Sequence, residues 1–343
     1  MKKLLYTLIA LLALNGSALA QLDANRTTST RIADLLAQMP ANDAAELERN
    51  AKEIAAMGAE GIVQMAGMMG APGKGDNSRL EYALGGFSLY ITQQGKEEWR
   101  QLAEKAYCLS LEKAADKEVK AFLIRQLQAV GSDESVAALQ TYLNDERLCD
   151  PAARALVQVG SPAAGQALLQ ALKDAQGACQ LSLVEGLGDL RYAEAAETLS
   201  GYAESGDDDL RKVSLYALAA IADPASGKIL SRAAAGSNYS YEVTDANASY
   251  LRYLQRLAEE GEERTAAKLA RKLLKRTGGE GQVHTRTAAL KLLAGMQGKE
   301  SLPLLLKAMK SDDPQYRLAA LEYARALGSP AATALWVKEL GRS

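Results

Sequence analysis

The sequence predicts an all-α protein built as an array of helix pairs, and two observations carry this prediction. Apolar residues recur at steps of three and four, as at Leu318, Leu321, Ala324 and Leu327, which is the period of an amphipathic helix. A phrase also repeats: "VGSDESVAALQTYL", "VGSPAAGQALLQAL" and "LGSPAATALWVKEL" each join two apolar stretches through a glycine turn. No run alternates as a strand would, so we expect no sheet.

Residues 1–20, "MKKLLYTLIALLALNGSALA", form a separate segment. Lys2 and Lys3 precede an apolar run over 4–14, and the segment ends in small residues at Ala20. This order is typical of a cleavable secretory signal, and the apolar run is shorter than the ~20 residues that cross a bilayer. We expect cleavage after Ala20 and a periplasmic or secreted protein.

The charge of the chain excludes one large class of partner. Loss of Lys2 and Lys3 with the signal changes the formal net charge from −2 to −4, because the segment holds no acid. Binding to nucleic acid requires a basic surface, so we expect no nucleic-acid partner. No later segment is apolar enough to predict a membrane span.

The N-terminal part of the mature chain, 21–115, is helical by period but fits the repeat poorly. We interpret it as a helical capping region of degenerate repeats, since a stacked array must shield its end faces. The regular units follow within 116–343. They cover 121–143, 152–172, 180–203, 211–234, 285–309 and 316–340.

Each regular unit has an apolar helix, a tight turn and a second apolar helix. One pair cannot bury its apolar face alone, so neighbouring units supply the core, and we expect the second helices to line a concave binding surface. The glycines expected to end first helices in a left-handed conformation are Gly131, Gly160, Gly188 and Gly328. The residues expected to start second helices are Ser132, Ser161 and Ser329 as caps, with Pro162 and Pro330 in the first turn.

Acidic turns precede several first helices, in "NDERLCDPAAR", "ESGDDDLRK" and "KSDDPQYR". In each, an aspartate is followed by an arginine, and at these residues the chain resembles the HEAT-repeat family. The resemblance implies a right-handed α-α superhelix, a HEAT-like solenoid of helix pairs, with Asp–Arg pairing between adjacent units. The matching pairs are Asp150/Arg154, Asp208/Arg211 and Asp313/Arg317. The unit at 177–188 lacks the arginine.

One segment, 233–276, breaks the rhythm with a long loop rich in tyrosine. Aromatic faces stack on ligands and short polar side chains bond to them, so the loop is a candidate carbohydrate- or protein-binding site. The candidate binding residues are Asn238, Tyr239, Tyr241, Glu242 and Asp245. Tyr250 and Tyr253 fall on a predicted helix, where we expect them to pack.

The same loop and the helices after it, "SNYSYEVTDANASYLRYLQRLAEEGEERTAAKLARKLL", resemble a stretch in secreted HEAT-repeat regions of Bacteroidetes proteins. In those proteins the repeats precede a 3-keto-disaccharide hydrolase domain, which has no counterpart in this chain. The resemblance implies an exported scaffold in a glycan-processing context. It carries no catalytic residue to this sequence.

Residues for familiar catalytic and metal chemistry are scarce. His284 is the single histidine, and it falls at the start of a predicted helix, where a surface or packing role is expected. No Cys–His spacing suits zinc, and "GAPGKGDN" departs from the phosphate-loop pattern, so we expect no metal and no cofactor. We interpret the clustered Met57, Met65, Met68 and Met69 as core residues.

The three cysteines are Cys108, Cys149 and Cys179. An odd number leaves at least one unpaired, even in an exported protein. Cys149 and Cys179 lie about one repeat apart, so they either form a disulfide or remain small buried thiols.

Two surfaces are candidate interfaces. The repeats stop while Leu335, Trp336 and Leu340 still form an apolar face, which predicts a protein partner or a missing C-terminal domain at this end. Within "ERTAAKLARKLLKR" (263–276), cations gather on one helix. They form either a solvated face or a contact for an acidic partner, with Arg271, Lys272 and Lys275 as the interface candidates.

These observations predict an exported, non-catalytic scaffold or binding module. Its expected partners are a protein and, through the tyrosine loop, a carbohydrate. One alternative is a structural envelope protein with no glycan role. Another is a glycan-active enzyme using two carboxylates near the loop, Glu242 and Asp245, since such acid–base chemistry needs no histidine.

Overall fold

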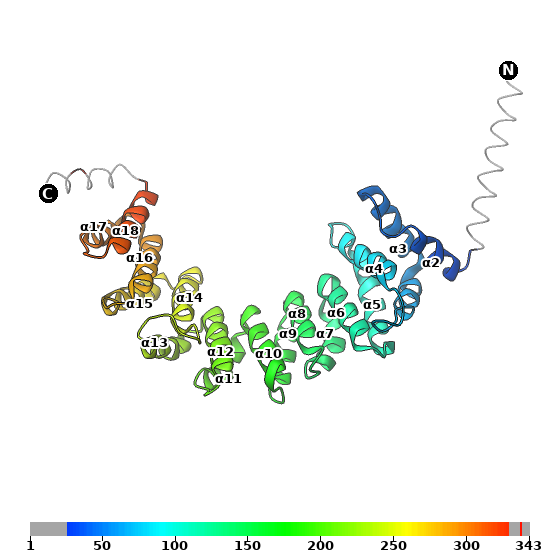
Figure 1. Cartoon of the computed structure of the whole chain (residues 1–343), viewed down its shortest axis with the longest axis horizontal. Helices are drawn as coiled ribbons and strands as arrows, with labels where there is room; N and C mark the ends of the chain where they lie inside the picture. The colour runs from blue at the N-terminus through cyan, green and yellow to red at the C-terminus, as the bar shows by residue number, and fades with distance from the viewer. Residues whose placement is uncertain (1–25, 329–336, 338–343) are drawn as a thin grey trace, which may run out of the picture. The chain divides into compact units, whose positions relative to one another are not determined.

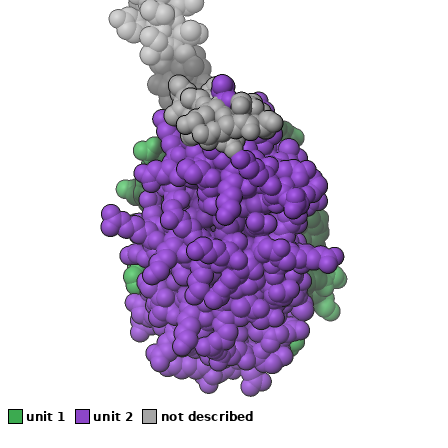
Figure 2. Space-filling view, turned by 90° about the vertical axis from the view of Figure 1, so that its left-hand side faces the viewer, with its two compact units in different colours: residues 1–164 green, residues 165–343 purple. Residues whose placement is uncertain are grey.

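The computed structural model describes residues 26–328 and residue 337. Within these residues the secondary structure consists of helices joined by turns, with no strand, so the predicted all-α class is confirmed. Figure 1 shows the helices following one another along the chain. The chain divides into two compact units, residues 1–164 and 165–343, coloured separately in Figure 2.

The first unit begins with four helices where the sequence predicts degenerate repeats. α3 packs on α4 and on α5, α5 packs on α6, and α6 packs on α8, so each layer supports the next. The helices are α2 (Thr28–Ala37), α3 (Ala44–Gly67), α4 (Ser78–Tyr90), α5 (Glu97–Lys113), α6 (Lys117–Val130), α7 (Asp133–Leu139), α8 (Cys149–Val159) and, at the boundary, α9 (Pro162–Ala171).

Tyr107 of α5 is one of the largest fully buried side chains of the first unit. The Tyr107 hydroxyl is 2.8 Å from Ser88 Oγ and donates to the Leu84 carbonyl oxygen at 3.2 Å. Burial raises the pKa of this phenol well above its ordinary value. Met57 and Met65 are buried in the same unit, which confirms a packing role for these two methionines, whereas the core prediction is wrong for Met68, which is 51% exposed.

The second unit repeats one plan of paired helices. Its helices are α10 (Gly177–Asp189), α11 (Ala196–Tyr202), α12 (Asp208–Ile221), α13 (Gly227–Gly236), α14 (Ala246–Glu259), α15 (Glu263–Arg276), α16 (Val283–Gln297), α17 (Leu302–Ala308) and α18 (Pro314–Ala326). The first helices α10, α12, α14, α16 and α18 pack each on the next, and the second helices lie against them. This stacking supplies the neighbour that each apolar face requires.

The apolar face of the last described helix differs from its prediction. α18 buries Tyr316, Ala320 and Ala324 against Leu290 and its neighbours in α16. Leu318 and Leu321, which share the predicted helical period, are exposed by 58% and 50%. The period therefore identifies the helix, and Ala324 and Leu327 of the predicted set do pack on this core. Leu318 and Leu321 do not, because Tyr316 and Ala320 take the positions that face α16.

The turn glycines serve two different purposes. Gly160 and Gly328 have φ of 71° and 41°, which confirms the left-handed prediction. Gly131 has φ −67°, because the chain leaves α6 in an extended conformation. The Glu104 carboxylate holds the next residue by accepting from the amide and the hydroxyl of Ser132. Gly188 lies inside α10, and the left-handed residue of that turn is Arg191.

The predicted caps are confirmed where the structure describes them. Ser132 Oγ accepts from the Glu134 amide at 3.3 Å, Ser161 Oγ accepts from the Ala164 amide at 3.2 Å, and α9 begins at Pro162. Ser329 and Pro330 lie outside the described residues, as do residues 1–20 and the predicted interface residues Leu335, Trp336 and Leu340.

Two of the three predicted Asp–Arg pairs form, and the predicted Asp313–Arg317 ion pair does not. Arg154 Nε is 3.1 Å from Asp150 Oδ1 in α8, and Arg211 pairs with Asp208 in α12, so both contacts close within one helix. Arg317 donates to the carbonyl oxygens of Ser311 and Asp312. Pairs between successive repeats include Arg147–Glu118 at 2.5 Å and Lys212–Asp245 at 2.8 Å.

The cysteines differ in state. Cys149 and Cys179 are disulfide-bonded, and Cys108 is a free, partly buried thiol. The thiol alternative for Cys149 and Cys179 is therefore wrong. Among the described helices, none is long and apolar enough to cross a membrane.

Candidate functional site

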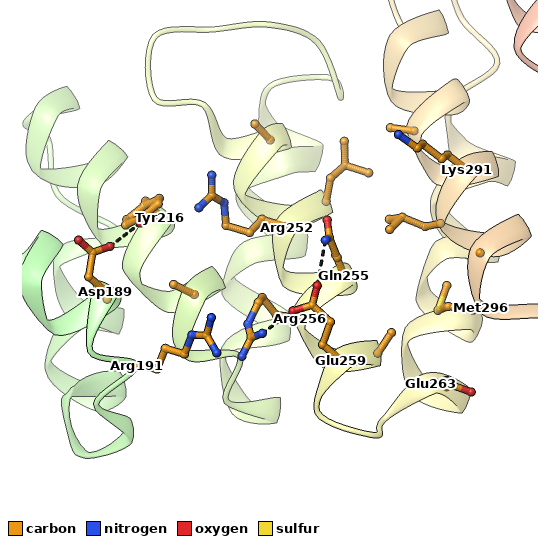
Figure 3. A pocket seen from close by; sticks show the side chains of 18 residues that line it. Asp189, Arg191, Tyr216, Arg252, Gln255, Arg256, Glu259, Glu263, Lys291 and Met296 are labelled. Carbon is orange, nitrogen blue, oxygen red and sulfur yellow. Dashed lines mark hydrogen bonds and ion pairs between the residues drawn. The ribbon is translucent and has the colours of Figure 1, made fainter. Parts of the chain in front are cut away.

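One candidate site is an open groove of about 1040 Å³ in the second unit. Figure 3 shows its side chains coming from α12, α14 and α16 and from the end of α10. These are first helices of their pairs, with only Glu263 at the start of a second helix. The prediction that second helices line the binding surface is therefore wrong for this groove, because here the first helices pack side by side and share one surface.

The middle wall of the groove is one face of α14. Ala248, Arg252, Gln255 and Glu259 follow at steps of four, three and four, so all four lie along one side of the helix. Gln255 Nε2 donates to Glu259 Oε1 at 2.9 Å along this row. A helix with this spacing presents a regular row of polar side chains to a ligand.

The wall formed by α10 and α12 holds a neutral phenol between opposite charges. The Tyr216 hydroxyl donates to Asp189 Oδ1 at 2.5 Å, and the Arg252 guanidinium lies 4.7 Å from the Tyr216 ring centroid. Burial, together with the hydrogen bond to Asp189, raises the pKa of Tyr216 although Arg252 opposes the change. The phenol therefore remains protonated at neutral pH, and its ring orients Arg252 through a cation–π contact.

The carboxylates on α14 are already occupied within the protein. Arg256, only 13% exposed, pairs with both Glu259 and Glu260. Hydrogen bonds from Gln255 and Arg256 lower the pKa of Glu259. Within the described residues, Arg191, Arg252 and Lys291 have no carboxylate partner, and Glu263 has no cation partner. The groove charges available to a ligand are therefore three exposed cations and one exposed carboxylate.

Apolar side chains form the rest of the lining. They are Ala220, Ala248, Leu251, Ala258, Ala288, Leu292 and Met296. Met side chains adapt readily to different surfaces, and Arg is enriched where proteins bind other proteins. The groove therefore combines an apolar floor with an excess of available cations, which suits a peptide segment that carries acidic and apolar residues.

Most of the predicted binding loop is engaged in holding its own conformation. Tyr239 is 7% exposed, its hydroxyl accepts from Arg276 at 3.3 Å, and its carbonyl oxygen accepts from Thr285 Oγ1 at 2.7 Å. Asn238 accepts twice from Gln282 Nε2, through its carbonyl and its side chain. The rings of Tyr239 and of the packed Tyr250 and Tyr253 are consequently not offered at the surface.

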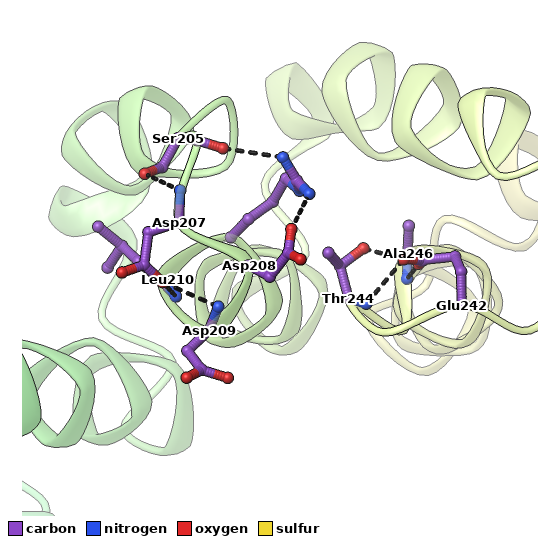
Figure 4. A network of polar contacts seen from close by, with 9 residues as sticks. Ser205, Asp207, Asp208, Asp209, Leu210, Glu242, Thr244 and Ala246 are labelled. Atoms are coloured by element: carbon purple, nitrogen blue, oxygen red, sulfur yellow. Dashed lines mark hydrogen bonds and ion pairs between the residues drawn. The ribbon is translucent and has the colours of Figure 1, made fainter.

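Glu242 caps the N-terminus of α14, as Figure 4 shows. Its carboxylate accepts from the Thr244 amide at 2.7 Å, the Thr244 hydroxyl at 2.6 Å and the Ala246 amide at 2.8 Å. Burial acts to raise the pKa of Glu242, but these hydrogen bonds and the charge of Arg211 outweigh it and lower the pKa. Glu242 is therefore an ionised cap, and a general acid would require the opposite change.

The same figure shows the comparable cap on α12. Asp207 Oδ1 accepts from the amides of Asp209 and Leu210 at 2.9 and 3.0 Å. Arg211 reaches back to the Ser205 carbonyl oxygen at 2.9 Å and pairs with Asp208. The run of aspartates thus serves a helix N-terminus, where the macrodipole favours negative charge.

The exposed part of the loop contacts the single histidine. Tyr241 is 81% exposed and stacks on His284 with ring centroids 4.3 Å apart, and Val243 beside it is 60% exposed. Tyr241, Glu242, Asp245 and His284 line a second cavity of about 110 Å³. Of the predicted loop residues, this cavity gathers Tyr241, Glu242 and Asp245, whereas Asn238 and Tyr239 are outside its lining.

The cationic helix face is present as predicted. Arg271, Lys272 and Lys275 of α15 are exposed, and no carboxylate among the described residues pairs with them. Their contact with an acidic partner remains a prediction. The described residues hold no group of three or more His, Cys, Asp and Glu side chains placed to bind a metal.

The groove residues Tyr216, Arg252 and Lys291 were not predicted. No local motif marks them, because they come from three helices that are distant in sequence and become neighbours only when the repeats stack. The sequence signal available was weak: a polar side chain recurring on the first helix of successive repeats, where the regular units favour small and apolar residues.

Comparisons with known proteins are consistent with this architecture. The family model described as HEAT repeats matches residues 106–185 and 166–252. The search of curated proteins found no match. None of the comparisons supports the likeness to hydrolase-associated regions.

Two solved structures are similar at low identity. An engineered protein is 18% identical with a TM-score of 0.38, and the match covers 90% of this chain and 92% of that one. A chain of the Kap95:Nup1 complex is 13% identical with a TM-score of 0.49, over 87% of this chain and 43% of that chain. At such scores neither likeness carries a functional argument. The family match and the paired helices together show an all-α, HEAT-like solenoid whose residues 106–252 carry HEAT repeats.

Proposed function

We propose that this protein is a non-catalytic scaffold that holds a peptide segment of a partner protein in the groove of α12, α14 and α16. A HEAT-repeat array is an architecture that suggests protein binding. The observation that carries the proposal is the excess of cations without carboxylate partners among the described residues, Arg191, Arg252 and Lys291, beside an apolar floor. The bound segment would present carboxylates to these cations and apolar side chains to the floor.

The test is selection of displayed random peptides on the immobilised protein, followed by affinity measurements on the enriched peptides. We expect enrichment of acidic residues next to apolar ones. The double variant Arg252→Glu/Lys291→Glu should bind these peptides at least tenfold more weakly, which corresponds to ~1.4 kcal/mol. Thermal melting of each variant checks that the fold is retained.

Two further variants make this experiment decisive. Lys228→Glu/Lys307→Glu reverses two exposed charges outside the groove and should leave peptide affinity unchanged. Lys272→Glu/Lys275→Glu tests the cationic face of α15. The proposal that the groove binds the peptide would be overturned by either of two results. The enriched peptides could bind the groove variant as tightly as the wild type, or they could lose affinity only with the α15 variant.

We propose that the scaffold works outside the cytoplasm, on the evidence of residues 1–20 with their small-residue end at Ala20. Expression of the full chain in a Gram-negative host should give a periplasmic or secreted product whose first residue is Gln21. A product that stays in the cytoplasm with Met1 intact would contradict this. A glycan-processing enzyme is the partner that we propose to test first, as the resemblance in the loop region implies.

The enzymatic alternative receives less support from the geometry. Hydrolysis by two carboxylates needs one of them protonated as a general acid. Glu242 is an ionised cap, and Asp245 pairs with Lys212 at 2.8 Å. Their shared cavity of about 110 Å³ is also small for a sugar ring and its neighbours.

A further inference from the structure

A small cavity lies next to the groove, between the loop before α14 and the start of α16. It has a volume of about 110 Å³ and is bordered by Tyr241, Glu242, Asp245, Asn247 and His284. That space exceeds the ~10–15 Å³ that one water needs, so it can take a small polar group. Every residue of its lining belongs to the second unit.

Asn247 borders this cavity, and its side-chain carbonyl oxygen is buried without a partner among the described residues. The residue is 5% exposed, and its Nδ2 donates to Thr285 Oγ1 at 2.5 Å. Thr285 gives its one hydroxyl proton to the Tyr239 carbonyl oxygen at 2.7 Å, so Thr285 Oγ1 can only accept from Asn247. This fixes the orientation of the amide and leaves Asn247 Oδ1 as the unsatisfied atom.

Buried carbonyl oxygens are almost always hydrogen-bonded, so an unsatisfied one at a cavity indicates a missing donor. Two neighbours also retain capacity to accept. Glu242 Oε2 accepts a single bond, from Thr244, and Asp245 uses Oδ2 for Lys212. A carboxylate oxygen has two lone pairs, so both groups can accept more.

The charges around the cavity favour a cation. Glu242 supplies a negative charge, and hydrogen bonds within the protein keep it ionised, whereas the charge of Asp245 is balanced by Lys212. The nearby cations Arg211 and Lys212 already pair with Asp208 and Asp245. The exposed face of Tyr241 adds the aromatic surface that a cation contacts favourably.

The apolar walls continue into the groove. Ala248, Leu251 and Ala288 line both the small cavity and the groove, so a side chain from a peptide in the groove could pass along them. A lysine has a four-carbon stem for these walls and an ammonium with three donors for three acceptors. We propose that this cavity binds the ammonium end of a lysine of the peptide that the groove holds, a proposal that rests on the proposed function.

The experiment uses the full-length protein and a small probe, N-acetyl-lysine methylamide, followed by the side-chain amide signal of Asn247 in NMR spectra. We expect saturable shifts with a dissociation constant on the order of 1–10 mM, as befits so small a ligand. The uncharged norleucine analogue should bind at least tenfold more weakly. Equal binding of the lysine probe and the norleucine analogue would show that the cavity recognises only the apolar stem, and would overturn the proposal.

Variants and a competing ligand complete the test. Asp245→Asn should weaken the lysine probe several-fold, whereas Asp209→Asn, a matched change on α12, should not. Asn247→Leu, if it folds, should abolish the shifts in the surrounding amides. Saturable binding of methyl glucoside instead of the lysine probe would also overturn the proposal, since it would assign the cavity to a neutral sugar.

The probe carries no carboxylate, so it does not test Arg252 and Lys291. If the probe binds but peptide affinity does not depend on the groove cations, the proposed role of the cavity is supported and the proposed role of the groove is overturned. If instead peptide binding depends on those cations, the enriched peptides show no preference for lysine and the probe causes no shifts, the role of the cavity is overturned and that of the groove is supported.

Discussion

Gly188 and Gly160 show that the same residue type meets two different physical demands in this array. Gly160 ends α8 with φ of 71°, a conformation that side chains with a Cβ adopt with strain. Gly188 has ordinary helical geometry inside α10, but a Cβ placed on it would lie 2.6 Å from the Cα of Ala217 in α12. There the absence of a side chain lets two first helices approach closely.

Gly188→Ala should therefore destabilise the second unit. The added methyl meets backbone that cannot rotate away, and overpacking of this kind costs ~1–3 kcal/mol. Gly201→Ala in α11 is the matched control, because nothing lies within 4 Å of the position that its added methyl would take, and alanine favours a helix. Urea unfolding followed by circular dichroism should show a lower midpoint for Gly188→Ala alone. An equal midpoint for both variants would contradict close packing at Gly188.

Cys108 should be a slow thiol in the folded protein. Burial raises its pKa to about 11, and Glu104 adds to the effect, so little thiolate is present near pH 8. Since the thiolate is the reacting form, alkylation by iodoacetamide should be on the order of 100-fold slower than in the unfolded chain. Mass spectrometry should find one label after unfolding without reductant and three labels after reduction. Three labels without reductant would contradict the disulfide state of Cys149 and Cys179.

At the scale of elements, the loop before α14 depends on side chains from several helices. Asn238, Tyr239 and Asp245 all have positive φ, a conformation that is uncommon outside glycine. Gln282 and Thr285 of the α16 region hold the first two through hydrogen bonds, and Glu242 closes the loop onto α14. The loop conformation is thus set by contacts with residues about 40 positions away, which a local sequence pattern does not reveal.

Helices with a clear apolar period were predictable, and their interruptions were less so. The stretch 44–67 has one continuous helical period, yet Gly58 breaks it with φ of 68° and ψ of −170°.

The length and composition of the tyrosine loop mark it as irregular, and Tyr241 is indeed exposed. Its neighbour Tyr239 turns inward because its hydroxyl and carbonyl oxygen find partners in Arg276 and Thr285. Burial of this kind is decided by tertiary contacts.

Glu242 makes the stability of this element depend on pH. Its folded pKa lies below the ordinary value of 4.5, so the stabilisation is fully present above that value and is lost as pH falls through the folded pKa. Glu242→Gln should therefore lower the urea midpoint near neutral pH, and the gap from the wild type should close in acid. Glu48→Gln, which removes an exposed partner of Lys52, should change little at either pH. A gap that widens in acid would contradict the capping role.

At the scale of the molecule, the substantial helix contacts within each unit join elements that are at most two helices apart in the chain. A structure of this kind has few long-range constraints, so its stability is close to a sum of repeat and neighbour contributions. Local damage should then spread only through adjacent helices. This expectation separates a stacked array from a globular protein with one central core.

Leu293→Ala tests that expectation. Leu293 of α16 is fully buried, and its truncation should cost ~2–5 kcal/mol through lost contacts and a cavity. Because α16 packs on α14, α15 and α18, hydrogen exchange should become faster across α14–α18, while α3–α6 should keep their protection. Leu84→Ala in α4, equally buried, should give the reverse pattern. If either variant instead raised exchange evenly along the whole described chain, the protein would unfold as one cooperative body, and stability summed over neighbouring repeats would be the wrong description of it.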